Sequence, residues 1–197
     1  MAIDKIRIME EIAVALPASF LDDVTGYKPQ REIELTARLA VLHHRRGIHW
    51  DRVPLYRPTY ERSEYFADSL FADDGVMVCE YPMFCQLKNE SIWGDMKADL
   101  LYFSKDRRTA VLVENKIGSN FTSGGNDVET GQLARQIEYL NEARVEHPVF
   151  VLLSARALFE AKWYWSELMA TIKHKTHCAR VRAHLMTWED IFRATAP

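Results

Sequence analysis

The chain has 197 residues, enough for one sizeable hydrophobic core, and its formal net charge is −3 at pH 7. A hydrophobic content of 48% with five Trp and nine Phe excludes intrinsic disorder, and no apolar run is long enough to cross a bilayer. The acids near the N-terminus do not fit a signal peptide and the three cysteines predict reduced thiols, so we expect a cytoplasmic protein without membrane contact.

The N-terminal part of the chain is predicted to be helical. Residues 3–16 have the apolar spacing of a helix, which Pro17 ends. Residues 30–46 predict a second helix with a broad apolar face, and Gly47 closes it. We expect residues 1–56 to form a helical extension that packs on the core of the protein.

The core is expected to span residues 57–197. A connection at 47–58 leads to a helix expected at 59–72, TYERSEYFADSLFA, which ends at a turn signal. A strand is then expected at 76–85, followed by a hairpin connection at 86–95 and by strands at 97–104 and 109–116. A polar loop at 118–126 leads to a helix at 128–145 and a strand at 149–153. The last expected elements are a helical region at 154–174, a strand at 181–186 and a helix N-cap at Thr187. This order predicts an α/β fold with a mixed central sheet flanked by helices.

The most informative segment is Glu114-Asn115-Lys116, which ends the apolar run 110–113. Alternation along a strand places Glu114 and Lys116 on the same face, and the preceding run is apolar on both faces, as in a central strand. An acid and a base at such a strand end are costly unless they are paired, bind a metal or open to a cleft. Asp99 begins the neighbouring strand and adds a second carboxylate. Two carboxylates and a lysine predict a site for Mg²⁺ and a phosphate.

The ordered string around these residues resembles the PD-(D/E)xK nuclease superfamily. Asp99 stands as the motif aspartate, Glu114-Asn115-Lys116 as the E-x-K, and Gln132-Leu133-Ala134-Arg135-Gln136 as the Q-L-x-R-like signature of the following helix. The resemblance covers residues 61–153, about half of the chain. It departs at Ala98, where the superfamily pattern has a proline that is frequently absent.

The resemblance implies a restriction-endonuclease-like mixed sheet flanked by helices, here with an N-terminal helical extension. It also implies metal-dependent hydrolysis of nucleic-acid phosphodiester bonds, with DNA favoured over RNA. Members of the superfamily serve in restriction, phage defence, repair and mobile elements, and we expect a defence or mobile-element role. The alternative is a catalytically inactive relative that acts as a nucleic-acid-binding or assembly module.

The resemblance also implies roles for the residues that match the motif. Asp99, Glu114 and the backbone carbonyl of Asn115 would hold Mg²⁺, for which Mn²⁺ could substitute. Lys116 would orient or help to deprotonate the attacking water and contact the scissile phosphate.

A third carboxylate is expected from a helix that precedes the core strands. Glu64 is the first candidate, because the helix expected at 59–72 stands just before a core strand. Glu61, one turn away, and Glu34, on the earlier helix, are alternatives. Asp95 competes with Asp99 for the motif position, but only Asp99 adjoins the apolar strand.

Polar residues on the helix expected at 128–145 form a stripe at helical spacing. Gln132 near the helix start could reach the metal-bound water or the phosphate. Arg135 and Gln136 could contact the nucleic acid. The alternative is a solvated helix face without a ligand.

The net charge of −3 is not typical of a protein that binds nucleic acid tightly by itself. We therefore expect a homodimer, a further domain or a partner to help deliver the target. Lys173-His174-Lys175 with Arg180 and Arg182 forms a modest basic patch, either ordinary surface or a nucleic-acid contact.

Overall fold

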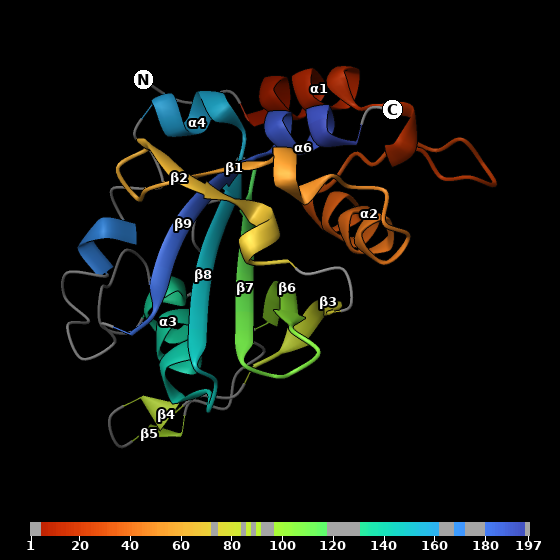
Figure 1. Cartoon of the computed structure of the whole chain (residues 1–197). Coiled ribbons are helices and arrows are strands. Elements are labelled where there is room, and N and C mark those ends of the chain that lie inside the picture. Colours follow the sequence, from red (N-terminus) through yellow and green to blue (C-terminus); the bar gives the residue numbers. More distant parts are fainter. Residues whose placement is uncertain are drawn as a thin grey trace.

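The computed structural model describes residues 5–71, 75–83, 86–87, 90–91, 97–117, 131–161, 168–171 and 180–195. The strands of the main sheet are β1 (Pro54–Tyr56), β2 (Arg62–Phe66), β3 (Val76–Pro82), β6 (Lys97–Phe103), β7 (Thr109–Lys116), β8 (His147–Ser154) and β9 (Arg182–Thr187). They form one seven-stranded sheet in the order β2-β1-β9-β8-β7-β6-β3 (Figure 1). A separate two-stranded hairpin pairs β4 (Gln86–Leu87) with β5 (Glu90–Ser91).

The sheet is mixed, as expected from the sequence. β7, β8 and β9 run parallel to one another, whereas β3, β6 and β7 form an antiparallel meander and β1 and β2 pair antiparallel at the opposite edge. The strands expected at 97–104, 109–116, 149–153 and 181–186 are confirmed as β6 to β9. The α/β class predicted from the sequence is therefore correct.

Helices cover both faces and one end of this sheet. Their bounds are α1 (Lys5–Ala15), α2 (Glu32–His44), α3 (Gln132–Glu142), α4 (Arg156–Glu160) and α6 (Trp188–Ala194), with 3₁₀ turns η1 (Ala18–Phe20), η2 (Trp50–Arg52) and η3 (Ala67–Ser69). α2 packs on β3, β6 and β7, α3 packs on β7 and β8, and α1 lies beside α6 at the end of the sheet (Figure 1). None of the helices in the described ranges is long and apolar enough to span a membrane.

The centre of the core is β7, and its sequence explains its place. Every residue from Ala110 to Lys116 is buried, and β8 is buried from Pro148 to Ser154. Strands that are apolar on both faces are stable only between two layers, which α2 and α3 provide here. The strand ends with charged residues in this dry environment, so their partners must come from the protein itself or from a ligand.

The prediction of a helix at 59–72 is wrong, because the structure has β2 and η3 there. After β1 the N–H of Arg57 donates to the carbonyl of Glu61, and Tyr60 adopts a left-handed φ of 62°, so the chain reverses. β2 then pairs antiparallel with β1. Pairing with an existing sheet edge satisfies the backbone groups of this segment, and this tertiary interaction overrides the local helical preference.

The contact between Gly75 and Tyr102 gives a test of core packing. A Cβ at residue 75 would lie 2.1 Å from the ring of Tyr102, which is fully buried and packs edge-on against Phe71 and His43. We expect Gly75→Ala to lower the free energy of unfolding by about 1–3 kcal/mol, measured by urea denaturation.

Two further variants isolate the cause of this effect. Gly47→Ala is the control, because the closest contact of its Cβ would be the end of the Leu42 side chain at 3.1 Å, and we expect a smaller loss. In a Tyr102→Leu background the additional cost of Gly75→Ala should shrink. An unchanged cost in that background would show that the ring contact is not responsible.

Candidate functional site

The two carboxylates of the predicted site come from neighbouring strands. β6 and β7 pair as far as Leu100 opposite Val113, so Asp99 and Glu114 are the next residues on the two strands, and the charge of Glu114 acts on Asp99. Side chains directly opposite each other in an antiparallel pair lie on the same face. The structure therefore brings together Asp99 and Glu114, as the sequence predicted.

Glu114 lies at the centre of a buried polar network. Its Oε1 is 2.7 Å from the ammonium Nζ of Lys116 and accepts a 2.7 Å hydrogen bond from Nε2 of Gln132. Its Oε2 accepts a hydrogen bond from Nε2 of Gln136. Glu114 is only 1% exposed and Lys116 6%, so this ion pair is shielded from water. Three N–H donors hold the carboxylate in one orientation.

The first turns of α3 supply both glutamines of this network. Gln132 and Gln136 are four residues apart, so they lie on the same side of the helix and face β7. Gln132 contacts Glu114, and its expected contact with a metal-bound water or a phosphate stays a prediction. The expected contact of Gln136 with nucleic acid needs correction, because its side chain is fully buried against Glu114. Arg135 is half-buried, and its contact with nucleic acid stays a prediction.

Asn115, between the two charged residues, faces the other side of the sheet. Its Nδ2 donates to the backbone carbonyl of Glu32 at 3.3 Å, and its Oδ1 accepts from Nε1 of Trp188 at 2.9 Å. Its backbone N–H donates to Oδ2 of Asp99 at 2.7 Å. Asn115 thus connects the site strand to α2, α6 and β6. The expected role of its carbonyl as a metal ligand stays a prediction.

Glu32, the first residue of α2, is the site residue that sequence reasoning missed. Its Oε1 accepts a hydrogen bond from the N–H of Ile117, directly after Lys116. An acid in the first turn of a helix is usually read as a partner of the helix dipole, and Glu34 gives the same signal two residues later. The sequence did indicate that a carboxylate would come from a helix upstream of the core strands. Glu32 on α2 is that carboxylate.

The three glutamates proposed from the sequence for this role lie elsewhere. Glu64 is exposed on β2, which β1, β9 and β8 separate from β7, so the structure corrects its placement. Glu61 is exposed, and its Oε2 lies 4.0 Å from Nη1 of Arg57. Glu34 accepts from the N–H of Gln30 and from the side chain of Arg31. Asp95, the alternative to Asp99, and the polar loop at 118–126 lie outside the described residues.

Burial and mutual repulsion perturb both carboxylates. Burial, followed by the charge of Glu114, raises the pKa of Asp99 to about 8, and the charge of Glu32 adds to this effect. The N–H of Asn115 and the ammonium of Lys116 oppose the shift. Burial also raises the pKa of Glu114, although Lys116 counteracts it. If both carboxyl groups ionised, the site would hold more negative charge than Lys116 neutralises, so Asp99 keeps its proton up to about pH 8.

The donor atoms of this site fit a hard divalent cation that is shared with a substrate. Among the residues that the structure describes, no three His, Cys, Asp or Glu side chains gather into a complete metal-binding group. Mg²⁺, however, is commonly held by one or two carboxylates, with waters and substrate phosphates completing its shell. Asp99 and Glu114 provide these carboxylates, and the pKa of Asp99 is raised first by burial and then by repulsion from Glu114, which a cation would relieve.

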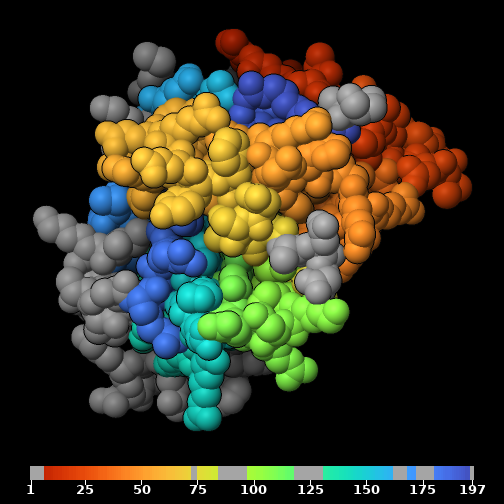
Figure 2. All heavy atoms as spheres, in the orientation of Figure 1, coloured from red at the N-terminus to blue at the C-terminus, as the bar shows by residue number. Residues whose placement is uncertain are grey.

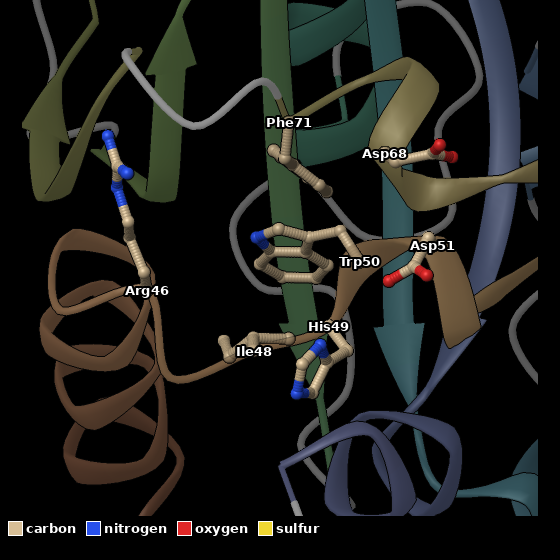
Figure 3. Close-up of a pocket in the computed structure, with 7 residues that line it drawn as sticks. All are labelled: Arg46, Ile48, His49, Trp50, Asp51, Asp68 and Phe71. Atoms are coloured by element: carbon tan, nitrogen blue, oxygen red, sulfur yellow. The ribbon is translucent and has the colours of Figure 1, made fainter.

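A pocket of about 460 Å³ lies apart from this site, beyond the end of α2 (Figure 3). The rings of Trp50 and Phe71 lie toward each other in it, with centroids 4.6 Å apart (Figure 3). None of the charged residues around Glu114 lines it. The lining residues are Arg46, Ile48, His49, Trp50, Asp51, Asp68 and Phe71.

Comparison with models of known families, with curated protein sequences and with solved structures gives no match to this chain. The assignment of the site therefore rests on its own geometry and charge.

The Glu114–Lys116 ion pair predicts a specific stability pattern. Lys116→Met leaves a buried carboxylate without its counter-charge, and we expect the free energy of unfolding to fall by about 3–5 kcal/mol. Adding Glu114→Gln removes the uncompensated charge and should restore more than half of this loss. Urea denaturation of the single and double variants measures both effects.

The matched control is Lys97→Met. Lys97 pairs with Glu80 at 3.4 Å on the surface, with its side chain 52% exposed, so its loss should cost about 0–1 kcal/mol. Equal losses in Lys116→Met and Lys97→Met would contradict a buried ion pair at Glu114.

The raised pKa of Asp99 predicts how stability depends on pH. Between pH 4 and pH 8 the folded chain keeps the Asp99 proton that the unfolded chain has lost, so Asp99 makes the folded state less stable as the pH rises. Asp99→Asn removes this contribution and preserves an oxygen that can accept from Asn115. In metal-free buffer the stability advantage of the variant should grow from about pH 4 to pH 8 and then stay constant. Thermal midpoints across this range test it, and an advantage that is independent of pH would refute the shift.

Proposed function

We propose that this chain is a metal-dependent hydrolase of phosphodiester bonds in nucleic acid, with DNA as the first substrate to test. The observation that carries the proposal is the juxtaposition of Asp99 and Glu114 from adjacent strands, with Lys116 paired to Glu114. The negative charge that would build up if Asp99 and Glu114 were both ionised supports a cation-dependent reaction.

Asp99 and Glu114, with the Asn115 carbonyl, would hold the cation. Bound Mg²⁺ would supply charge neutralisation at the phosphate and activation of a water molecule. Lys116 carries a compact ammonium with three donors, which suits orientation of a water and contact with a phosphate oxygen.

Other residues act on Glu114 or on its strand. Gln132 and Gln136 are positioning residues, because their amides fix the carboxylate of Glu114 in one rotamer. Glu32 secures the backbone after Lys116 through the N–H of Ile117 and adds negative charge near Asp99. Partners of this kind commonly change metal affinity or activity tenfold to a hundredfold when they are removed.

One observation favours the second candidate, a catalytically inactive binding module. Both oxygens of Glu114 already accept N–H donors from the protein, so this carboxylate is satisfied without a ligand, whereas the buried Oε1 of Gln136 accepts no hydrogen bond from the described residues. A buried network of this kind can serve stability alone. The cleavage experiment separates the two candidates.

We expect cleavage of supercoiled plasmid, single-stranded DNA or RNA by the wild-type chain in Mg²⁺ or Mn²⁺ and none in EDTA. Asp99→Asn and Glu114→Gln should each lower the rate by at least about 100-fold, because each removes a charge from the reacting centre. Glu32→Gln should lower it by about 10-fold to 100-fold.

Glu64→Gln is the matched control, because Glu64 was proposed from the sequence but lies exposed on β2. It should cut like the wild type. Cleavage that persists in Asp99→Asn and Glu114→Gln would place the activity elsewhere. If the wild type does not cut, calorimetric titration with Mn²⁺ decides: binding lost in Glu114→Gln indicates a metal site that lacks a partner, and no binding supports the inactive module.

A further inference from the structure

Three chain segments meet at the end of the sheet opposite the candidate site. They are the β6–β7 turn at 104–108, the segment at 143–147 before β8, and the segment at 180–182 at the start of β9. The N–H of His147 donates to the carbonyl of Arg108 at 2.9 Å, and Arg180 donates to the carbonyl of Ala143. Figure 2 shows the starts of β8 and β9 and the β6–β7 turn together on the lower part of one face. We call these three segments the basic end.

The basic end concentrates positive charge on a chain whose net charge is negative. All of its charged side chains are exposed. It holds two acids, Asp106 and Glu146, against six basic residues, which are Lys105, Arg107, Arg108, Arg144, Arg180 and Arg182. The whole chain carries −3, so the positive field is local to this surface.

Several of these charges are available to a ligand. Arg108 pairs with Glu146 at 2.5 Å. In the described part of the chain, the guanidinium groups of Arg107, Arg144 and Arg182 have no acidic partner, so no ion pair offsets their charge. Arginine presents a planar fork of donors that matches the oxygens of a phosphate group.

The backbone at Arg107 gives an independent reason to look for a function here. Arg107 has φ 59°, a left-handed conformation that glycine adopts without strain and that disfavours larger side chains. The tight turn, closed by the N–H of Arg107 donating to Ser104 at 2.9 Å, would accept glycine at this position. Arg46, Tyr60 and Glu80 are also left-handed, so the outlier at Arg107 motivates a hypothesis for its side chain only together with the surrounding positive charge.

The basic end is separate from the candidate site. β7 runs from Thr109 beside the basic end to Glu114 in the site. Five residues of strand span about 17 Å, so Arg107 cannot contact a phosphate that lies at Glu114.

We propose that the basic end binds the phosphate backbone of nucleic acid at a distance from the site of cleavage. The proposal rests on the proposed function, because an acidic site on a net-negative chain needs a second surface to hold a polyanion. A substrate that reaches both must pass around the helices that cover β7, so it would extend at least about five base pairs from the scissile bond, at about 3.4 Å per base pair. Among the described residues, the large hydrophobic side chains that are exposed lie outside the basic end, which disfavours a membrane surface.

The proposal is tested by measuring how the protein binds a fluorescent 20-base-pair DNA duplex. Fluorescence anisotropy is recorded over a series of salt concentrations, in EDTA so that the duplex is not cleaved. Arg107→Gly should weaken binding by about threefold to tenfold and reduce the slope of log K against log salt by about one. The triple variant Arg107→Gly, Arg144→Ser, Arg182→Ser removes the three arginines without an acidic partner among the described residues and should reduce the slope by about three. Arg107→Gly should not lower the thermal midpoint, because glycine relieves the left-handed strain.

The control is Arg62→Ser, which removes an exposed arginine from β2 at the far edge of the sheet and should leave affinity and slope unchanged. Wild-type affinity and slope in the triple variant would overturn the proposal. Preferential binding of phosphatidylserine vesicles over DNA, lost in Arg107→Gly, would also overturn it and assign the surface to lipid. Loss of DNA binding in the variants supports it whether or not the wild type cuts, so failure of the proposed function remains distinguishable.

Discussion

The arrangement of β7, α3 and the candidate site depends on how the buried carboxylate of Glu114 is paired with its donors. A charge in the dry centre of an α/β sheet is tolerated only when donors surround it, and here an ammonium from the same strand and two amides from α3 do so. These contacts fix how α3 packs on β7. They also leave Asp99, on the adjacent strand, next to the charge of Glu114. Burial and this charge raise the pKa of Asp99 more than Lys116 lowers it.

Much of the central architecture could be predicted because its sequence signals are local. The apolar runs that became β6, β7 and β8 are continuous, and the turn between β6 and β7 is polar. Thr187 caps α6 as predicted, with its side-chain oxygen accepting from the N–H of Asp190. The pairing of Asp99 with Glu114 followed from the hairpin, since a short turn leaves few possible registers.

The errors arose where the decisive partner is distant in sequence. Arg62–Phe66 became a strand because β1 offered an edge, and β1 exists because it pairs with β9 more than a hundred residues later. The choice of Glu32 over Glu34 depends on the way α2 meets the end of β7. Gln136 seemed part of a solvated stripe, but the carboxylate it binds lies on another element. Residue type and spacing carry no information about such contacts.

Two backbone amides at the end of β7 donate to carboxylate oxygens rather than to a neighbouring strand: Asn115 to Asp99 and Ile117 to Glu32. A hydrogen bond to a charged acceptor is shorter and stronger than one to a neutral acceptor. The proton resonances of these amides should therefore move when the carboxylates ionise or acquire a ligand. The fold thus contains two built-in spectroscopic reporters, which would reveal the charge state of the site in solution before any substrate is identified.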